Sequence, residues 1–338
     1  MTYQSEKALV QAHYAALSRA TPDTVASVLA DRTSADWHWR GMHPFHEQHG
    51  AEAVAASFWT PFLTAMSRVQ RREDIFIAGH NEIDGFQSVW TISMGHLMGL
   101  FDAPFLGIPP TRRIAMLRYA EFNKVENGRI TETALFCDLI HLMHQAGLRP
   151  LPPQTGAHLV QPGPMTHDGL LHADADPETG PETLALINRM IGDINAQGRQ
   201  MTPQEELAQS WHDDMIWWGP DGIGATWTID RYIEQHQRPF RTQIRDRRFN
   251  GHICRLAEGN FGGFFGWANL TLANSGGYMG LPMGPGPADM RVVDMYRRDG
   301  DKLAENWIFI DILHFLNMQG LDVLGRMQSV SGGAPAVI

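Results

Sequence analysis

The sequence GDKLAENWIFIDIL occupies residues 300–313, and this stretch decides the fold of the second half of the chain. It opens on a Gly-Asp turn and continues with the alternation of side chains that is typical of a strand. A period of two places Trp307, Phe309 and Asp311 on one face of this strand. The apolar spacing that follows, with a stop at Gly320, predicts a short helix directly after the strand.

The same segment occurs earlier in the chain, displaced by 173 residues. Residues 104–148 align with residues 277–321 without a gap, and Asp138 then falls opposite Asp311. A second block, displaced by 178 residues, aligns the Trp-x-Gly segments of the two halves. Two blocks repeated in the same order indicate tandem homologous domains.

The length of the chain agrees with this duplication, because 338 residues exceed what one hydrophobic core usually serves. Between the repeats lies a segment rich in proline, which resists both helix and central strand. This segment is either a linker or a loop draped over the domains. The expected division is 1–150 for the first domain, 151–180 for the linker and 181–330 for the second domain.

Each half begins with helical periodicity and then changes to the alternating pattern of strands. The first helix of each half is expected over residues 5–19 and 182–196, and the third over residues 51–68 and 229–243. A Thr-Pro pair marks the start of each second helix, at Thr21 and Thr202. Helices followed by an antiparallel meander indicate the α+β class.

Composition excludes two classes of partner. The net charge of −10 leaves no basic stripe for phosphates, so we expect no nucleic acid to bind. No stretch approaches the about 18 apolar residues that span a membrane, and residues 1–10 lack the pattern of a signal peptide. The sequence therefore predicts a cytoplasmic protein without a membrane partner. Cys137 and Cys254 are too few for a disulfide framework or a thiolate metal site.

The segment HPFHEQH at residues 43–49 raises the question of a metal site. It lacks the His-Glu-x-x-His spacing, and Pro44 would interrupt a helix. The second copy has other residue types, Asp221 among them, at the histidine positions. We therefore predict that the chain binds no metal.

The segment quoted first resembles the closing hairpin of the SnoaL-like polyketide cyclases, a family of the nuclear-transport-factor-2-like superfamily. In that family a strand of the form dGkIaEhW is followed, four residues after the tryptophan, by an aspartate and then by a short helix that ends in QlG. The second copy has Trp307 and Asp311 at this spacing and ends its helix at Gln319-Gly320, whereas the first copy keeps Asp138 but has Ala134 in place of the tryptophan. The resemblance implies two tandem cone-shaped domains, each with three helices packed on a strongly curved antiparallel sheet.

The resemblance also implies a reaction. The family aspartate removes a proton beside a carbonyl, or protonates the oxygen as a ring closes by aldol condensation, and it needs no metal or organic cofactor. A carboxyl group beside aromatic side chains in an apolar cone loses hydration, which raises its pKa toward the range useful for acid and base chemistry. The catalytic candidates are Asp311, Asp138, His314 and His141. The candidates for substrate binding are Trp307, Trp217, Trp39, Phe309 and Phe136.

The sequence thus predicts a polyketide cyclase or a related cofactor-independent acid/base enzyme, of isomerase or lyase type, that acts on a small hydrophobic carbonyl compound. Asp311 and Asp138 also stand where they would cap the helix that follows each of them, as many aspartates do. A noncatalytic small-molecule-binding module of the same fold is therefore the alternative, and a pair of domains that serves only as a scaffold is the third. Because the same surface occurs twice, we expect the domains to pack as an intramolecular pseudo-dimer.

Overall fold

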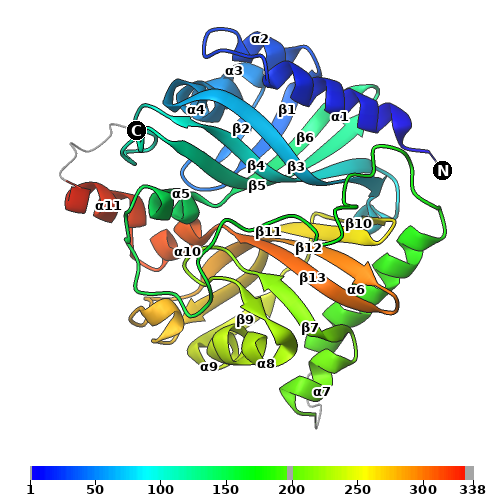
Figure 1. Cartoon of the computed structure of the whole chain (residues 1–338), viewed down its shortest axis with the longest axis vertical. Coiled ribbons are helices and arrows are strands. Elements are labelled where there is room, and N and C mark those ends of the chain that lie inside the picture. The colour runs from blue at the N-terminus through cyan, green and yellow to red at the C-terminus, as the bar shows by residue number, and fades with distance from the viewer. Residues whose placement is uncertain (1, 196–200, 332–338) are drawn as a thin grey trace.

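The computed structural model describes residues 2–195 and 201–331. Figure 1 shows two domains stacked on each other with their sheets in the middle. Most helices lie toward the opposite ends of the molecule, whereas the short helices that follow the last strand of each domain lie beside the junction of the domains. None of the helices in the described ranges is long and apolar enough to cross a membrane.

The first domain contains the following elements: α1 (Gln4–Leu17), α2 (Val25–Ala30), β1 (Thr33–Gly41), β2 (Glu47–His49), α3 (Ala51–Val54), η1 (Ala55–Trp59), α4 (Thr60–Ala65), β3 (Met66–His80), η2 (Glu82–Asp84), β4 (Val89–Phe101), β5 (Ile114–Glu126), β6 (Arg129–Cys137) and α5 (Leu139–Gln145). Elements α3, η1 and α4 follow one another directly and form one helical segment. The domain thus has three helical segments before its long strands, as the sequence predicts.

The second domain repeats this series: α6 (Thr179–Asn195), α7 (Pro203–Ala208), β7 (Trp211–Trp218), β8 (Thr226–Trp227), α8 (Thr228–Tyr232), η3 (Ile233–Gln237), α9 (Arg238–Gln243), β9 (Ile244–Phe249), β10 (Cys254–Glu258), β11 (Phe261–Asn274), η4 (Tyr278–Gly280), β12 (Ala288–Asp299), β13 (Lys302–Ile310), α10 (Ile312–Met318) and α11 (Val323–Ser331). The predicted end of the first helix of this half, at Ala196, lies outside the described residues.

The two sheets have the same strand order. It is β2-β1-β6-β5-β4-β3 in the first domain and β8-β7-β13-β12-β11-β10 in the second, where β9 also pairs with β11. Each sheet is antiparallel except for one parallel pair, β1 with β6 and β7 with β13. The long strand β3 of the first domain therefore corresponds to the two short strands β9 and β10, and the second sheet is interrupted at residues 250–253.

Local signals account for several boundaries. Asn127 and Gly128 both have positive φ in the turn between β5 and β6, a conformation that asparagine and glycine tolerate best. Thr202 forms a capping box with Glu205 at the start of α7. The first-domain counterpart differs, because α2 begins only at Val25 and Thr21 precedes it in a turn.

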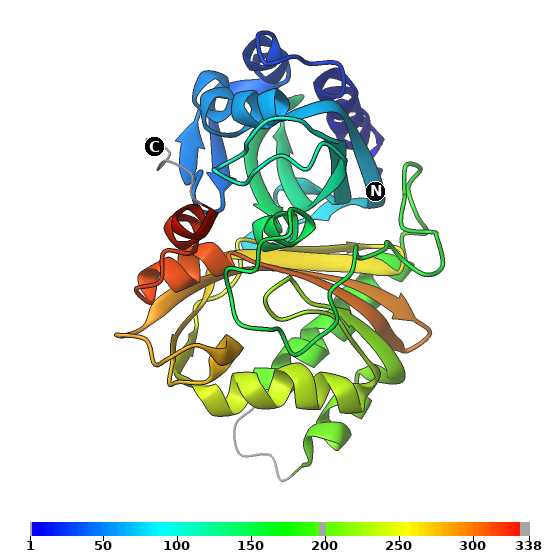
Figure 2. The same ribbon diagram turned by 60° about the vertical axis from the view of Figure 1, so that its left-hand side comes forward.

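The sheets pack face to face through one apolar cluster that we call the seam cluster. Phe122 and Phe136 of the first sheet meet Phe265, Trp307 and Phe309 of the second sheet in it. Figure 2 shows the same stacking from the side. The opposite face of each sheet packs on the helices of its own domain. Both faces of each sheet are therefore buried, and the chain forms an intramolecular pseudo-dimer.

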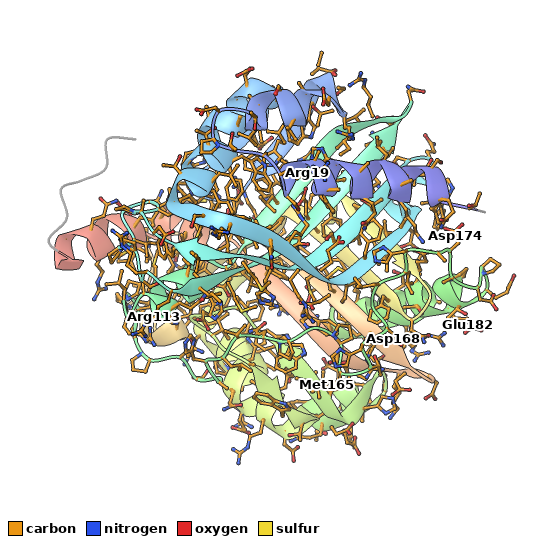
Figure 3. The ribbon with its side chains drawn as sticks, turned by 45° about the horizontal axis from the view of Figure 1, so that its top comes forward. Arg19, Arg113, Met165, Asp168, Asp174 and Glu182 are labelled. Carbon is orange, nitrogen blue, oxygen red and sulfur yellow. The ribbon has the colours of Figure 1, made fainter. Side chains whose placement is uncertain are left out.

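The proline-rich segment between the domains is draped over both of them. Its Leu170 pairs with Phe76 of β3, and the carbonyl of Pro162 accepts a hydrogen bond of 3.0 Å from Trp307 Nε1. The side chains of Met165, Asp168 and Asp174 follow its course along the molecule in Figure 3. Of these, Asp174 accepts hydrogen bonds from the start of α1.

Candidate active site

Asp311 lies at the end of β13 and caps α10. One carboxylate oxygen, Oδ1, accepts a hydrogen bond of 3.2 Å from His314 N, the geometry of an N-cap. The other oxygen, Oδ2, accepts from His43 N of the first domain at 3.0 Å and lies 3.3 Å from Arg291. Burial is the main reason why the pKa of Asp311 rises to about 6, against these hydrogen bonds, which lower it.

Asp138 makes the matching contacts at the end of β6. Its Oδ1 accepts from His141 N at 2.9 Å, and its Oδ2 accepts from Asp221 N of the second domain at 2.9 Å. Burial and the nearby charge of Asp221 raise its pKa to about 6. Each aspartate therefore caps a helix of its own domain and binds a backbone N–H of the other domain.

The aromatic residues predicted beside these aspartates do not face a cone. Alternation does place Trp307, Phe309 and Asp311 on one face, and likewise Phe136 and Asp138, but that face is turned toward the other domain. Trp307, Phe309 and Phe136 are buried in the seam cluster. These three residues were predicted to line a substrate cavity. They pack in the seam cluster instead, because the face of the sheet that carries them is covered by the other domain.

Trp39 and Trp217 do lie inside the cones. Trp39 is enclosed by the rings of Phe45 and Phe58, with centroid distances of 6.5 and 6.0 Å, in the packed core of the first domain. Trp217 stacks on His236 at 4.1 Å and lines a cavity in the second domain. Of the five aromatic candidates, Trp217 alone borders this cavity.

His141 and His314 occupy the first turn of α5 and α10, at the seam between the domains. Burial lowers the pKa of each imidazole to about 4. The Nε2 atoms of both rings are buried and have no hydrogen-bond partner among the described residues. The backbone N–H of His141 donates to Asp138, and that of His314 donates to Asp311. Each predicted His-Asp pair is therefore close in space, but as a helix cap and not through the imidazole.

The cavity of the second cone has a volume of about 170 Å³. Its lining residues come from the inner face of the sheet, from helix α6 and from the interruption between β9 and β10. The residues that line it are Met190, Ile191, Ile194, Trp211, Trp217, Tyr232, Phe249, His252, Phe264, Asn269, Leu270, Val292, Asp294, Tyr296, Asn306 and Ile308.

Asp294 of β12 supplies the carboxyl group of this cavity. It is buried, and its Oδ1 accepts a hydrogen bond of 3.0 Å from Asn306 Nδ2. Burial raises its pKa to about 7, although hydrogen bonds to Asn306 and Tyr296 lower it in part. The pKa of the Tyr296 hydroxyl is in turn raised well above its usual value by burial and by Asp294, so this hydroxyl stays protonated. At neutral pH Asp294 is therefore poised between its acid and base forms.

Two further groups in the cavity are hydrogen-bond donors that the protein leaves unused. Asn269 Oδ1 accepts from Val292 N at 2.7 Å, but Asn269 Nδ2 is buried and has no partner in the described part of the chain. The indole Nε1 of Trp211 is likewise buried without a hydrogen-bond partner among the described residues. A buried donor without a partner costs free energy unless a ligand accepts from it.

The corresponding carboxyl group of the first cone is already paired. Glu121 of β5, at the position that matches Asp294, forms an ion pair of 2.8 Å with Arg71, and both side chains are 5% exposed. The Arg71 guanidinium also stacks over the rings of Tyr14 and Tyr119, at 3.7 and 4.5 Å. This carboxylate is neutralised within the protein, so the second cone is the better site for proton transfer.

Asp294 is not among the residues predicted from the sequence, although a signal for it is present. An isolated acid occurs in the apolar strand sequence VVDMY at residues 292–296, and the first copy has Glu121 at the same place. A charged residue repeated within an apolar strand is unusual, because a lone carboxylate is costly to bury.

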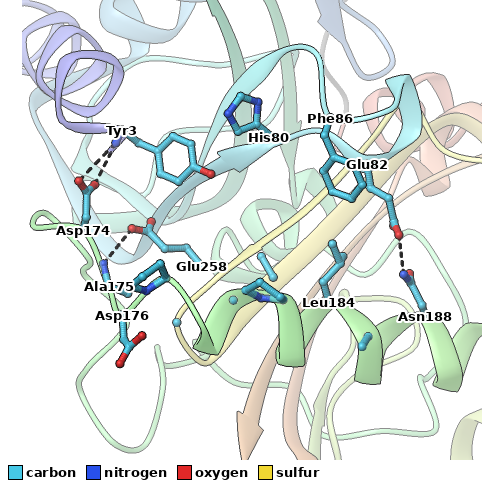
Figure 4. A pocket seen from close by; sticks show the side chains of 16 residues that line it. Tyr3, His80, Glu82, Phe86, Asp174, Ala175, Asp176, Leu184, Asn188 and Glu258 are labelled. Atoms are coloured by element: carbon cyan, nitrogen blue, oxygen red, sulfur yellow. Dashed lines mark hydrogen bonds between the residues drawn. The ribbon is translucent and has the colours of Figure 1, made fainter. Parts of the chain in front are cut away.

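A larger groove, of about 570 Å³, lies between the domains near the N-terminus (Figure 4). Its acids have partners: Asp174 accepts from Tyr3 N, and Glu82 accepts from Asn188. Glu258 accepts from Lys7 and from Ala175 N. Because the protein itself satisfies these carboxyl groups, the described residues of the groove offer no unpaired acid like that of the second cone.

Comparison with known proteins identifies one family. The family model named "SnoaL-like domain" matches residues 10–133, which lie within the first domain. No protein with curated annotation matches the sequence.

Solved structures were also found that resemble parts of the chain. A SnoaL-like protein from Jannaschia sp. CCS1, named as a polyketide-cyclase candidate, is 19% identical, with 38% of this chain and 80% of that chain covered and a TM-score of 0.30. IdmH from Streptomyces antibioticus, also named as such a candidate, is 15% identical, with coverages of 42% and 98% and a TM-score of 0.30. An NTF2-like protein from Burkholderia xenovorans LB400 is 11% identical, with coverages of 41% and 97% and a TM-score of 0.33.

Proposed function

We propose that this chain, whose residues 10–133 match the SnoaL-like domain model, is a cofactor-independent acid/base enzyme whose active site is the cone of its second domain. Its substrate is a small hydrophobic carbonyl compound, and Asp294 is the group that transfers the proton. Asp311 and Asp138 hold helices and domains in place. The observation that carries this proposal is a buried carboxyl group with a pKa of about 7 in a mostly apolar cavity.

The proposed step begins with ionised Asp294. The carboxylate removes a proton from a carbon beside the substrate carbonyl, and the C–H electron pair moves to form an enolate. Negative charge then develops on the carbonyl oxygen, which accepts a hydrogen bond from one of the unused donors described above, Asn269 Nδ2 or Trp211 Nε1. Protonated Asp294 then returns the proton to another carbon. In an aldol-type ring closure the enolate carbon instead attacks a second carbonyl, and protonated Asp294 gives its proton to the alkoxide that forms.

The cavity limits the size of the substrate. Its volume of about 170 Å³ is below the about 300–1,000 Å³ of sites that hold drug-sized ligands. Trp217, Tyr232 and Phe264 provide aromatic walls for a planar molecule. A compound of one or two rings therefore fits this proposal better than a polycyclic one.

Deuterium exchange into 2-tetralone tests the proposal, because this two-ring ketone has an acidic C–H beside its carbonyl. We expect the protein to accelerate exchange in D₂O, as followed by NMR, and we expect Asp294→Asn to abolish the acceleration. The matched control is Asp311→Asn, which removes a buried aspartate outside the cavity and should retain exchange. Exchange that survives Asp294→Asn, or that is lost only in the control, contradicts the proposal. A noncatalytic binding module would bind 2-tetralone without accelerating exchange.

A further inference from the structure

We propose that the seam between the domains contains a site for one divalent transition-metal ion, formed by His141, His158 and Asp221. Each residue offers one ligand atom, and these atoms all lie within 4.8 Å of one another. The sequence pattern predicts no metal, and the proposed ligands lie outside the histidine-rich segment at residues 43–49. The proposal is independent of the proposed function, because none of its residues borders the second cone.

The three residues come from three different parts of the chain. His141 belongs to α5 of the first domain, His158 to the segment draped between the domains, and Asp221 to the loop after β7 of the second domain. An ion bound there would join both domains and the linking segment. Two imidazoles and one carboxylate are ligands that zinc accepts, with a fourth position left for water.

The Asp221 carboxylate is oriented for this role by two histidines. His144 Nδ1 and His158 Nδ1 each lie 2.8 Å from Asp221 Oδ2. His144 is therefore a positioning residue that holds the carboxylate, as outer-shell partners of metal sites commonly do.

An unpartnered nitrogen provides the second, independent observation. The His141 side chain is 2% exposed, and its Nε2 is buried without a hydrogen-bond partner among residues 2–195 and 201–331. The other ring nitrogen, Nδ1, lies 3.3 Å from Gln145 Nε2. A metal at Nε2 moves the ring proton to Nδ1, so Gln145 gives up that contact and keeps its 2.9 Å bond to the Met116 carbonyl. We infer that Nε2 is the ligand atom of His141.

The charged groups around the three ligands and the exposure of His158 also bear on metal binding. The charges of Asp138 and Asp221 act on the Arg118 guanidinium, which donates to the carbonyls of Ile308 and Trp218 and not to either carboxylate. Zinc–ligand bonds of about 2.0–2.2 Å require the three atoms to move closer together than 4.8 Å. His158 can supply this movement, because its side chain is 36% exposed.

The pseudo-symmetric position shows what the site depends on. There His314 matches His141, but His43 replaces Asp221 and Asn317 replaces His144. The second position therefore lacks the carboxylate and its orienting histidine. We expect one seam site per chain, on the side of Asp221.

Zinc titration of chelator-treated protein tests this inference. Wild type should bind one Zn²⁺ at the seam, its Tm should rise with added Zn²⁺, and Co²⁺ bound in its place should give visible d–d absorption. In His158→Gln we expect the affinity to fall at least about tenfold and the Co²⁺ spectrum and the Tm shift to disappear. The control His172→Gln removes an exposed histidine of the same segment and should behave as wild type.

Two further variants make the outcome decisive. Asp221→Asn should lose the site, whereas Asp294→Asn in the second cone should bind zinc as wild type does, so failure of the metal site and of the proposed function are separable. Equal zinc binding by wild type and His158→Gln, both folded by circular dichroism, would overturn the inference. The His144–Asp221–His158 contacts would then be a hydrogen-bond network only.

Discussion

Asp294→Asn should stabilise the protein at alkaline pH while it removes the proposed activity. In the folded protein the pKa of Asp294 is raised from 3.8 to about 7. The folded state therefore retains a proton that the unfolded state releases above about pH 4, and raising the pH from 4 to 7 reduces the free energy of unfolding. At about 1.4 kcal/mol for each tenfold change, the full effect is about 4 kcal/mol.

Asparagine has nearly the same shape and carries no charge. Its Oδ1 can still accept from Asn306, and its amide group can donate to the Tyr296 hydroxyl. The gain in stability over wild type should therefore be small near pH 4 and should grow by about 2–3 kcal/mol between pH 5 and pH 8. Asp138 and Asp311 also have raised pKa values, but they are present in both proteins, so their contributions cancel in the comparison.

Urea unfolding of wild type and Asp294→Asn at pH 5 and pH 8 measures this difference directly. The reasoning is refuted if the variant gains no stability over wild type between the two pH values. That result would mean that Asp294 is ionised at both, as an ordinary exposed carboxylate is.

Two other substitutions test the remaining carboxyl groups. Glu121→Gln should leave the buried Arg71 charge without its carboxylate and lower the free energy of unfolding by about 3–5 kcal/mol; a Tm equal to that of wild type would show that the ion pair contributes little. Asp311→Asn keeps an oxygen that can cap α10 at His314 N, but it turns an amide group toward the N–H of His43. Near pH 4, where removal of the Asp311 charge contributes little, the expected cost is about 1–3 kcal/mol, and exchange activity should be retained. A variant that is as stable as wild type at this pH would argue against an interdomain hydrogen bond.

The repeat and the strand pattern predict much of the fold. The internal duplication implies two domains with one topology, and the common strand order agrees with that. Thr202 begins its helix as predicted, because a capping box depends on neighbouring residues alone. Local signals of this kind act within one turn of helix, so they are readable from sequence.

The position of the site depends on long-range packing, which the sequence pattern does not contain. A period of two tells which side chains share a face of a strand, but not which face lines the cone. In β13 Trp307 is 0% exposed and Ile308 is 9% exposed, so hydrophobicity fails to distinguish the two faces. The first sheet covers the face of β13 that carries Trp307. The cavity therefore lies on the opposite face of the second sheet, where the side chains of Asp294 and Asn306 line it.

The cluster of His141, His158 and Asp221 at the seam also could not be predicted from local sequence patterns. His141, His158 and Asp221 are far apart in the sequence, and none of them stands in a ligand-spacing motif. They meet because the domains stack and the linking segment crosses the seam, where Ala157 pairs with Ala225. Such a cluster becomes visible only when the relative placement of three segments is known.

The pH dependence of 2-tetralone exchange tests the central claim most directly, because it reports the charge state of the group that removes the proton. The rate for wild type, corrected for exchange catalysed by hydroxide alone, should rise with pH through a midpoint near 7 and then level, as Asp294 ionises. Asp294→Asn should show only the uncatalysed rate at every pH. A profile that keeps its midpoint in Asp294→Asn would contradict the account and would place the chemistry outside the second cone.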